Sequence, residues 1–221
     1  MMFSCGGSFI NDRFILTAAH CVSDASSPSE FIVILHAFTT NDFNNPQLQY
    51  RVKNFMKHPA WNGGENKVSP NDVALLELER PLQFNNRFMP ICLTTNTQYN
   101  NLFVAGWGMM DKRTFFGTQL VEPPTLREVE LNEVPSAQCK RQMPIDPQRE
   151  ICAGDRKATC QGDSGGPLMT RMNGKVYQTG IVSFGIKYCS TQQVAPSVFE
   201  RPGFHINWIR QNTQGAQWCS A

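Results

Sequence analysis

A serine set between glycines is the residue of this sequence best suited to act as a nucleophile. Ser164 lies in the segment 160–167, which reads Cys-Gln-Gly-Asp-Ser-Gly-Gly-Pro. Glycine adopts backbone angles closed to other residues and lets a substrate approach closely. Acyl transfer needs a nucleophile and preorganised hydrogen-bond donors for the negative charge that develops. Taken alone, the segment could be an ordinary glycine-rich turn, so its interpretation depends on partner residues elsewhere.

Two further segments offer such partners. His20 lies in the short apolar segment 16–21, beside a cysteine that could fix its place. Asp72 directly precedes the apolar run 73–76, so its carboxylate could be buried at the start of a strand. A buried charge is costly unless it is paired, and an imidazole N–H would pair it while fixing the tautomer of a general base. The remaining histidines are interpreted as structural or surface residues: His36, His58 and His205.

The order His20, Asp72, Ser164 along the chain is that of the chymotrypsin-type catalytic triad. With three matching motifs in this order, the chain resembles the chymotrypsin/trypsin-like serine proteases over essentially its whole length. The resemblance implies that Ser164 attacks a peptide carbonyl, that His20 takes and returns the proton, and that Asp72 orients His20. It also implies an oxyanion hole formed by the backbone N–H groups of Gly162 and Ser164.

The composition limits the partners to be expected. A chain of 221 residues with 41% hydrophobic residues can form one domain with a sizeable core. Its net charge of +2 gives no argument for nucleic acid or a membrane surface, and no apolar run approaches the roughly 20 residues that span a bilayer. The first residues do not read as a signal peptide. We expect a monomer that acts on protein or peptide substrates, with no metal, cofactor, nucleic acid or membrane partner.

Many short apolar segments, separated by clusters of Asn, Gly and Pro, predict an all-β fold. The resemblance implies one domain over 1–221, made of two packed antiparallel Greek-key β-barrels with the catalytic cleft at their junction. A short C-terminal α-helix is expected on the second barrel. The predicted bounds are about 1–88 for the first barrel, 89–101 for the crossover, 102–203 for the second barrel and 204–213 for the helix.

The eight cysteines indicate an oxidising compartment, and with the resemblance they predict a secreted, extracellular protein. Their pairing cannot be chosen from the sequence alone. The resemblance implies the disulfides Cys5–Cys21, Cys139–Cys152 and Cys160–Cys189. Cys92 and Cys219 are left over and could pair with each other, pair with partners outside this sequence, or be free. Of these, we favour a disulfide that tethers Cys92 to a propeptide or regulatory module.

Specificity is predicted from the residues that match the substrate pocket. In the trypsin branch of the family an aspartate at the pocket base holds a substrate Arg or Lys, and Ala158 stands at that position here. A cation would be buried there without a partner, which is costly. Gly185 leaves one wall open and Ser197 narrows the other, so we predict chymotrypsin- or elastase-like rather than tryptic specificity. The other residues expected to contact substrate are Gln161, Ser183 and Phe184, the last standing where tryptophan is usual.

The sequence departs from the family at its beginning. Family members normally start, after activation, with Ile/Val-Val-Gly-Gly, and the new α-amino group inserts beside the aspartate that precedes the catalytic serine. Asp163 matches that aspartate, but this sequence starts almost at Cys5 and lacks the segment, together with the first strand of the first barrel. We therefore expect Asp163 to turn toward solvent or another donor and the Gly162 N–H to lose its position.

Two hypotheses follow from this departure. The first is a truncated form of an active secreted serine endopeptidase, and the complete triad favours it. The alternative is a catalytically impaired, zymogen-like homologue that acts as a binding or regulatory protein.

Overall fold

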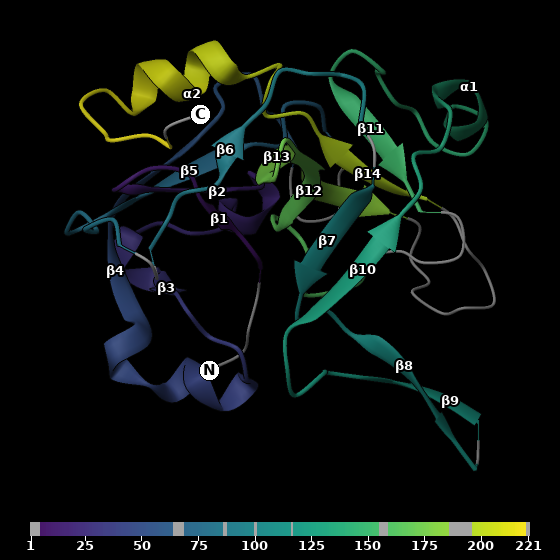
Figure 1. The fold of residues 1–221 in the computed structure, drawn as a ribbon, viewed down its shortest axis with the longest axis horizontal. Helices are drawn as coiled ribbons and strands as arrows, with labels where there is room; N and C mark the ends of the chain where they lie inside the picture. Colours follow the sequence, from purple (N-terminus) through teal and green to yellow (C-terminus); the bar gives the residue numbers. More distant parts are fainter. Residues whose placement is uncertain are drawn as a thin grey trace.

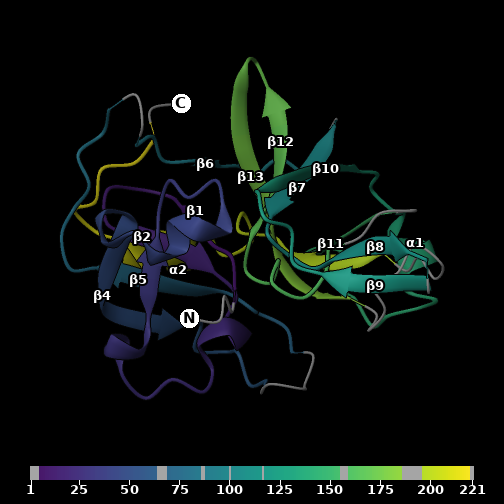
Figure 2. The same ribbon diagram turned by 90° about the horizontal axis from the view of Figure 1, so that it is seen from below.

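The computed structural model describes residues 5–63, 69–85, 88–99, 101–115, 117–154, 159–185 and 196–219. Over these residues the chain is nearly all β, with 3₁₀ turns and two short α-helices. Two curled antiparallel half-barrels lie side by side (Figures 1 and 2). The predicted all-β architecture of two curled antiparallel halves is therefore confirmed.

The first half is a five-stranded sheet in the order β1-β2-β5-β4-β3. Its strands are β1 (Ser8–Phe9), β2 (Phe14–Thr17), β3 (Ile32–Ile34), β4 (Gln49–Lys57) and β5 (Ala74–Leu78). All of its pairings are antiparallel. The loops of this half contain four 3₁₀ turns: η1 (His20–Val22), η2 (Pro28–Glu30), η3 (Thr40–Asn44) and η4 (Pro46–Leu48).

The second half is a sheet in the order β10-β7-β12-β13-β14-β11, with β6 paired in parallel to β13. Its strands are β6 (Cys92–Leu93), β7 (Leu102–Gly106), β10 (Arg127–Leu131), β11 (Glu150–Ala153), β12 (Pro167–Met172), β13 (Lys175–Gly185) and β14 (Ser197–Glu200). A separate hairpin, β8 (Met110–Thr114) and β9 (Gly117–Val121), extends away from this sheet (Figure 1). The helix α1 (Ser136–Cys139) precedes β11.

Strands β2 and β5 of the first half are largely apolar because both of their faces are buried. Successive side chains of a strand point to opposite faces. In β2, Phe14 and Leu16 belong to one core cluster, whereas Ile15 belongs to another. Leu75 and Leu76 of β5 divide in the same way. This sheet therefore packs on both sides and holds the residues at its ends firmly in place.

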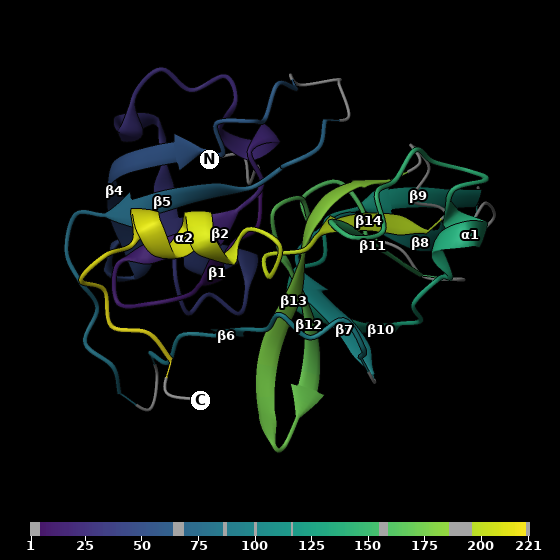
Figure 3. The same ribbon diagram turned by 90° about the horizontal axis from the view of Figure 1, so that it is seen from above.

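The C-terminal helix α2 (Ile206–Asn212) covers one of these faces. Its buried Ile209 shares a cluster with Leu16 and Leu75 of the first sheet, and Figure 3 shows the helix lying across β2 and β5. The expectation that this helix sits on the second barrel is therefore wrong in its placement. After β14 the chain returns to the first half, where α2 buries apolar side chains of β2 and β5.

Two of the predicted disulfides are present, Cys5–Cys21 and Cys139–Cys152. Cys160 is also disulfide-bonded, and its predicted partner Cys189 lies outside the described residues.

The structure corrects the expected tether through Cys92. Cys92 in β6 is bonded to Cys219, 127 residues later, with Cα atoms 5.4 Å apart. The C-terminal segment is brought there by contacts with the first half: the Gln217 N–H donates to Asp12 at 2.8 Å. The guanidinium of Arg210 also lies 3.8 Å from the centre of the Trp218 ring. These contacts hold Cys219 beside Cys92, which leaves no thiol at Cys92 for an outside partner.

We expect replacement of both Cys92 and Cys219 by alanine to lower the free energy of unfolding by about 5 kcal/mol, because the bond closes a long loop of the unfolded chain. Urea unfolding without reductant measures this. The matched control removes Cys139 and Cys152, which close a loop of 13 residues, and should cost about 2 kcal/mol less. An unchanged urea midpoint in the first variant would mean that Cys92 and Cys219 are not joined in solution.

Candidate active site

The antiparallel pairing of β2 and β5 brings His20 and Asp72 together. Thr17 at the end of β2 lies opposite Ala74 at the start of β5. Residues that follow β2 therefore meet residues that precede β5. His20 begins the turn η1, and Asp72 stands two residues before β5.

The carboxylate of Asp72 is buried, with 4% of the residue exposed, and three groups donate to it. Its Oδ2 lies 2.7 Å from Nδ1 of His20, and its Oδ1 accepts the His20 backbone N–H at 2.9 Å. The hydroxyl of Ser183, on β13 of the second half, donates to Oδ2 at 2.6 Å. An ionised carboxylate only accepts hydrogen bonds. Nδ1 of His20 therefore carries the proton, and Nε2 is left as the basic nitrogen.

Ser164 and His20 line the same cleft, which has a volume of about 700 Å³. The Ser164 carbonyl accepts the Gly6 N–H at 2.7 Å, which joins the nucleophile loop to the first half. Gly165 has φ +77°, and a Cβ on it would collide with Thr17. Among the described residues no hydrogen bond joins Ser164 Oγ to His20. The two side chains therefore share a cleft and are not hydrogen-bonded to each other.

Asp163 lies against backbone donors. Its Oδ1 accepts the Gly108 N–H and its Oδ2 accepts the Cys160 N–H, both at 2.9 Å. Burial raises the pKa of this carboxyl, and the N–H groups of Cys160 and Gly108 lower it in part. No ion pair reaches Asp163 from the described part of the chain. A Cβ on Gly106 or Gly108 would collide with the carboxylate, so the two glycines make the room that it occupies.

The described pocket residues lie at the paired ends of two strands. Gly185 at the end of β13 is opposite Ser197 at the start of β14. The Ser197 hydroxyl is held by Thr159, whose N–H and hydroxyl donate to it at 3.1 and 2.8 Å. Phe184 packs against the cluster that contains Val198. Gln161 accepts the Met109 N–H through its carbonyl, and Ala158 lies outside the described residues.

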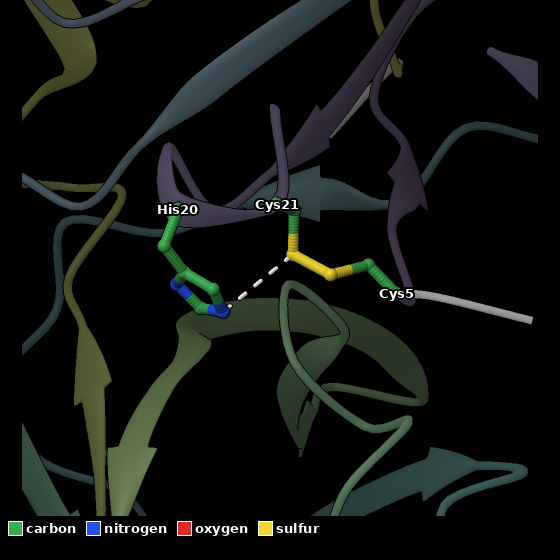
Figure 4. Close-up of side chains that lie close together, drawn as sticks. All are labelled: Cys5, His20 and Cys21. Atoms are coloured by element: carbon green, nitrogen blue, oxygen red, sulfur yellow. Dashed lines mark hydrogen bonds between the residues drawn. A yellow bond between two sulfur atoms is a disulfide. The ribbon is translucent and has the colours of Figure 1, made fainter. Parts of the chain in front are cut away.

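Cys5, His20 and Cys21 form a compact group that has the residue types of a metal site (Figure 4). Nε2 of His20 lies 3.7 Å from Sγ of Cys21. The two sulfur atoms are joined in a disulfide, and the metal-binding form of cysteine is the thiolate. We therefore assign this group to bracing the His20 turn.

A second buried His–carboxylate pair escaped the sequence analysis. Glu200 at the end of β14 lies 2.6 Å from His205, and both residues are buried. The sequence predicts a structural or surface role for His205 and indicates no partner for it at Glu200. The sequence signal for this pair is the glutamate at the end of the buried strand Ser197–Glu200. A charged residue in such a strand needs a hydrogen-bonding or ionic partner.

Comparison with known proteins matches residues 2–209 to the family Trypsin. Melanization protease 1 of Drosophila melanogaster is 32% identical over 241 residues, which cover 95% of this chain and 58% of that protein. CLIP domain-containing serine protease B4 of Anopheles gambiae is 31% identical over 228 residues, covering 95% and 62%. Serine protease 41 of Homo sapiens is 32% identical over 225 residues, covering 94% and 68%.

Two curled antiparallel half-barrels around a cleft with a His–Asp pair and a serine are the architecture of a trypsin-like serine protease. The chain belongs to the trypsin family. It spans about three-fifths of the length of the first relatives, between 58% and 62%. Within the described residues, no helix has the length and apolar character needed to cross a membrane.

We expect Gly108→Ala to lower the free energy of unfolding by about 1–3 kcal/mol, because the added methyl runs into the Asp163 carboxylate. Asp163→Ala in the same chain removes the obstacle, so the double variant should lose less than the sum of the single losses. Urea unfolding of the four proteins measures this coupling. Strictly additive losses would show that Asp163 does not occupy this place in solution.

Proposed function

We propose that this chain is a serine endopeptidase that hydrolyses peptide bonds through an acyl-enzyme. The observation that carries the proposal is the buried Asp72, bonded to Nδ1 of His20 at 2.7 Å in a cleft that Ser164 also lines. This arrangement leaves Nε2 of His20 unprotonated, so that it can act as a base toward a nucleophile in the cleft. A serine between glycines is a suitable nucleophile for acyl transfer.

In the proposed reaction, Oγ of Ser164 attacks the carbonyl carbon of the scissile bond while Nε2 of His20 takes the hydroxyl proton. The oxyanion is stabilised by the N–H groups of Gly162 and Ser164. His20 then passes the proton to the leaving amine, and water attacks the acyl-enzyme by the same route. The contact between nucleophile and base is often long in free enzymes and tightens when substrate binds. The lack of a hydrogen bond between Ser164 and His20, both described residues, agrees with this.

We propose a neutral substrate pocket of chymotrypsin- or elastase-like preference. Support comes from Ser197, whose hydroxyl is engaged by Thr159 across from Gly185, so the described walls present no carboxylate to a substrate cation. The disulfides support an extracellular protein. Its substrates are proteins or peptides and it acts as a monomer. Because Cys92 is bonded to Cys219, any regulatory module would have to attach by another route.

The alternative is a zymogen-like homologue with a binding or regulatory role. Asp163 favours it, because among the described residues this half-buried carboxyl takes hydrogen bonds from backbone N–H groups and pairs with no cation. The endopeptidase requires the N–H groups of Gly162 and Ser164 to point at the oxyanion, whereas in the zymogen-like homologue the Gly162 N–H is out of position. Loss of one such donor costs about 10² to 10³ in turnover.

A fluorophosphonate probe tests the proposal, because it labels only a serine that a neighbouring base activates. We expect labelling of the activated, full-length protein and none of Ser164→Ala. Asp72→Asn should label about 10⁴-fold more slowly, since the amide favours the wrong His20 tautomer. Ser29→Ala, a change at an exposed serine, is the matched control and should label like the unchanged protein. Absence of labelling in the activated protein would contradict the endopeptidase and favour the alternative.

A further inference from the structure

The buried pair of Glu200 and His205 lies behind the candidate triad. Oε1 of Glu200 is 2.6 Å from Nε2 of His205, and the two residues are 0% and 3% exposed. Glu200 ends β14, and His205 is the residue immediately before α2. Their protonation is therefore set by the protein around them and not by direct contact with solvent.

Glu200 is surrounded by charged groups from several elements. Nε of Arg149 lies 4.0 Å from Oε1, and Glu150 stands directly opposite Glu200 in the pairing of β11 and β14. The ring of His58 lies 4.9 Å from that of His205. Asp72 is close enough to act on Glu200 by its charge. Among the described residues, Oε2 of Glu200 has no hydrogen-bond partner.

These surroundings favour an uncharged pair. Burial and, after it, the charge of Asp72 raise the pKa of Glu200 to about 8, against the opposing effects of Arg149 and the N–H groups of Asp72 and Asn71. Burial and, after it, the charge of Arg149 lower the pKa of His205 to about 4. Burial, followed by the neighbouring His205, also lowers the pKa of His58. Arg149 is itself paired to the more exposed Asp146 at 3.2 Å. Its positive charge is therefore partly neutralised by Asp146 and acts less strongly on Glu200.

We propose that Glu200 is a positioning residue of the candidate triad: uncharged and hydrogen-bonded to His205, it supports the turn that carries Asp72 and leaves the negative charge beside His20 on Asp72. The inference rests on the proposed function, because it assigns Glu200 a role in that site.

The turn that carries Asp72 is tight. Asn71 has φ +63°, a left-handed angle that asparagine adopts more readily than most residues. The turn is closed by the Val73 N–H, which donates to the Asn71 carbonyl at 2.8 Å. Glu200 reaches this turn through His205, whose ring lies 4.9 Å from that of His58. The His58 N–H in turn donates to the carbonyl of Val73, the residue after Asp72, at 3.0 Å. A charged Glu200 would repel Asp72, whereas a neutral one fills the space and offers acceptors.

The decisive variant is Glu200→Gln, which keeps the size of the side chain and cannot be charged. If Glu200 is already neutral, we expect the pKa of His20, followed by NMR titration, to change by less than about 0.3 units. The labelling rate with fluorophosphonate should stay within about threefold of the unchanged protein. A charged Glu200 would instead stabilise the protonated form of His20. A fall of about 1 unit in the His20 pKa would therefore overturn the proposal.

The variant Glu200→Ala tests whether the hydrogen bond of Glu200 to His205 is needed for the reactivity of Ser164. We expect it to label about tenfold more slowly than the unchanged protein while Glu200→Gln restores the rate, because an amide can still bond to His205. Equal labelling rates for the alanine variant and the unchanged protein would also overturn the proposal. The NMR titration of His20 needs no activity. A protein that fails to label at all, but whose His20 titrates as expected, would contradict the proposed function and not this inference.

The pH dependence of stability gives an independent test. The folded pair holds one proton between pH values of about 4 and 8. The unfolded residues, with pKa values of 4.5 and 6.5, also hold one between those two values but none above. The folded state thus binds the extra proton between pH 6.5 and 8, and stability must fall as pH rises through this window.

We expect the urea midpoint of the unchanged protein to fall between pH 6.5 and 8, and this fall to be smaller in Glu200→Gln, where the proton is absent. Glu79→Gln, a change at an exposed glutamate of the same half as Asp72, is the matched control and should keep the full fall. An identical fall in the unchanged protein and in Glu200→Gln would show that Glu200 is charged throughout this range.

Discussion

Burial of the Asp72 carboxylate is the constraint on which the rest of the site depends. A charge removed from water must be met by donors, and Asp72 receives them from the His20 backbone, the His20 ring and the Ser183 hydroxyl. The first two belong to one half of the fold and the third to the other. One buried charge thus fixes the orientation of the imidazole and ties the two half-barrels together where the cleft opens.

Two further carboxyl groups near the cleft are also withdrawn from water and need hydrogen-bond partners. Asp163 accepts bonds from two backbone N–H groups, in a space that exists only because residues 106 and 108 are glycines. Glu200 is met by His205 at 2.6 Å, and in our proposal it also keeps its proton. Three carboxyl groups in or behind the cleft, two of them fully buried, are therefore compensated in different ways. The one best supplied with donors is the one that the proposed chemistry needs to be charged.

Much of the fold could be predicted because its signals are local or come in motifs. The alternation of apolar runs and turn residues indicated the β architecture, and the disulfides Cys5–Cys21 and Cys139–Cys152 followed from the resemblance. The partner of Cys92 and the place of α2 were predicted wrongly. Both depend on where the C-terminal segment packs, and that is decided by the outer face of β2 and β5, distant in sequence.

The sequence by itself determined the family and the residues with the chemistry for acyl transfer, because His20, Asp72 and Ser164 lie in recognisable motifs in a diagnostic order. Only the tertiary structure decided what those residues touch. The donors to Asp72, the glycine-lined place of Asp163 and the pairing of Glu200 with His205 are contacts between segments far apart in the chain. Hydrogen bonds and charge effects act over a few ångströms in space, and no local pattern encodes which distant groups will meet.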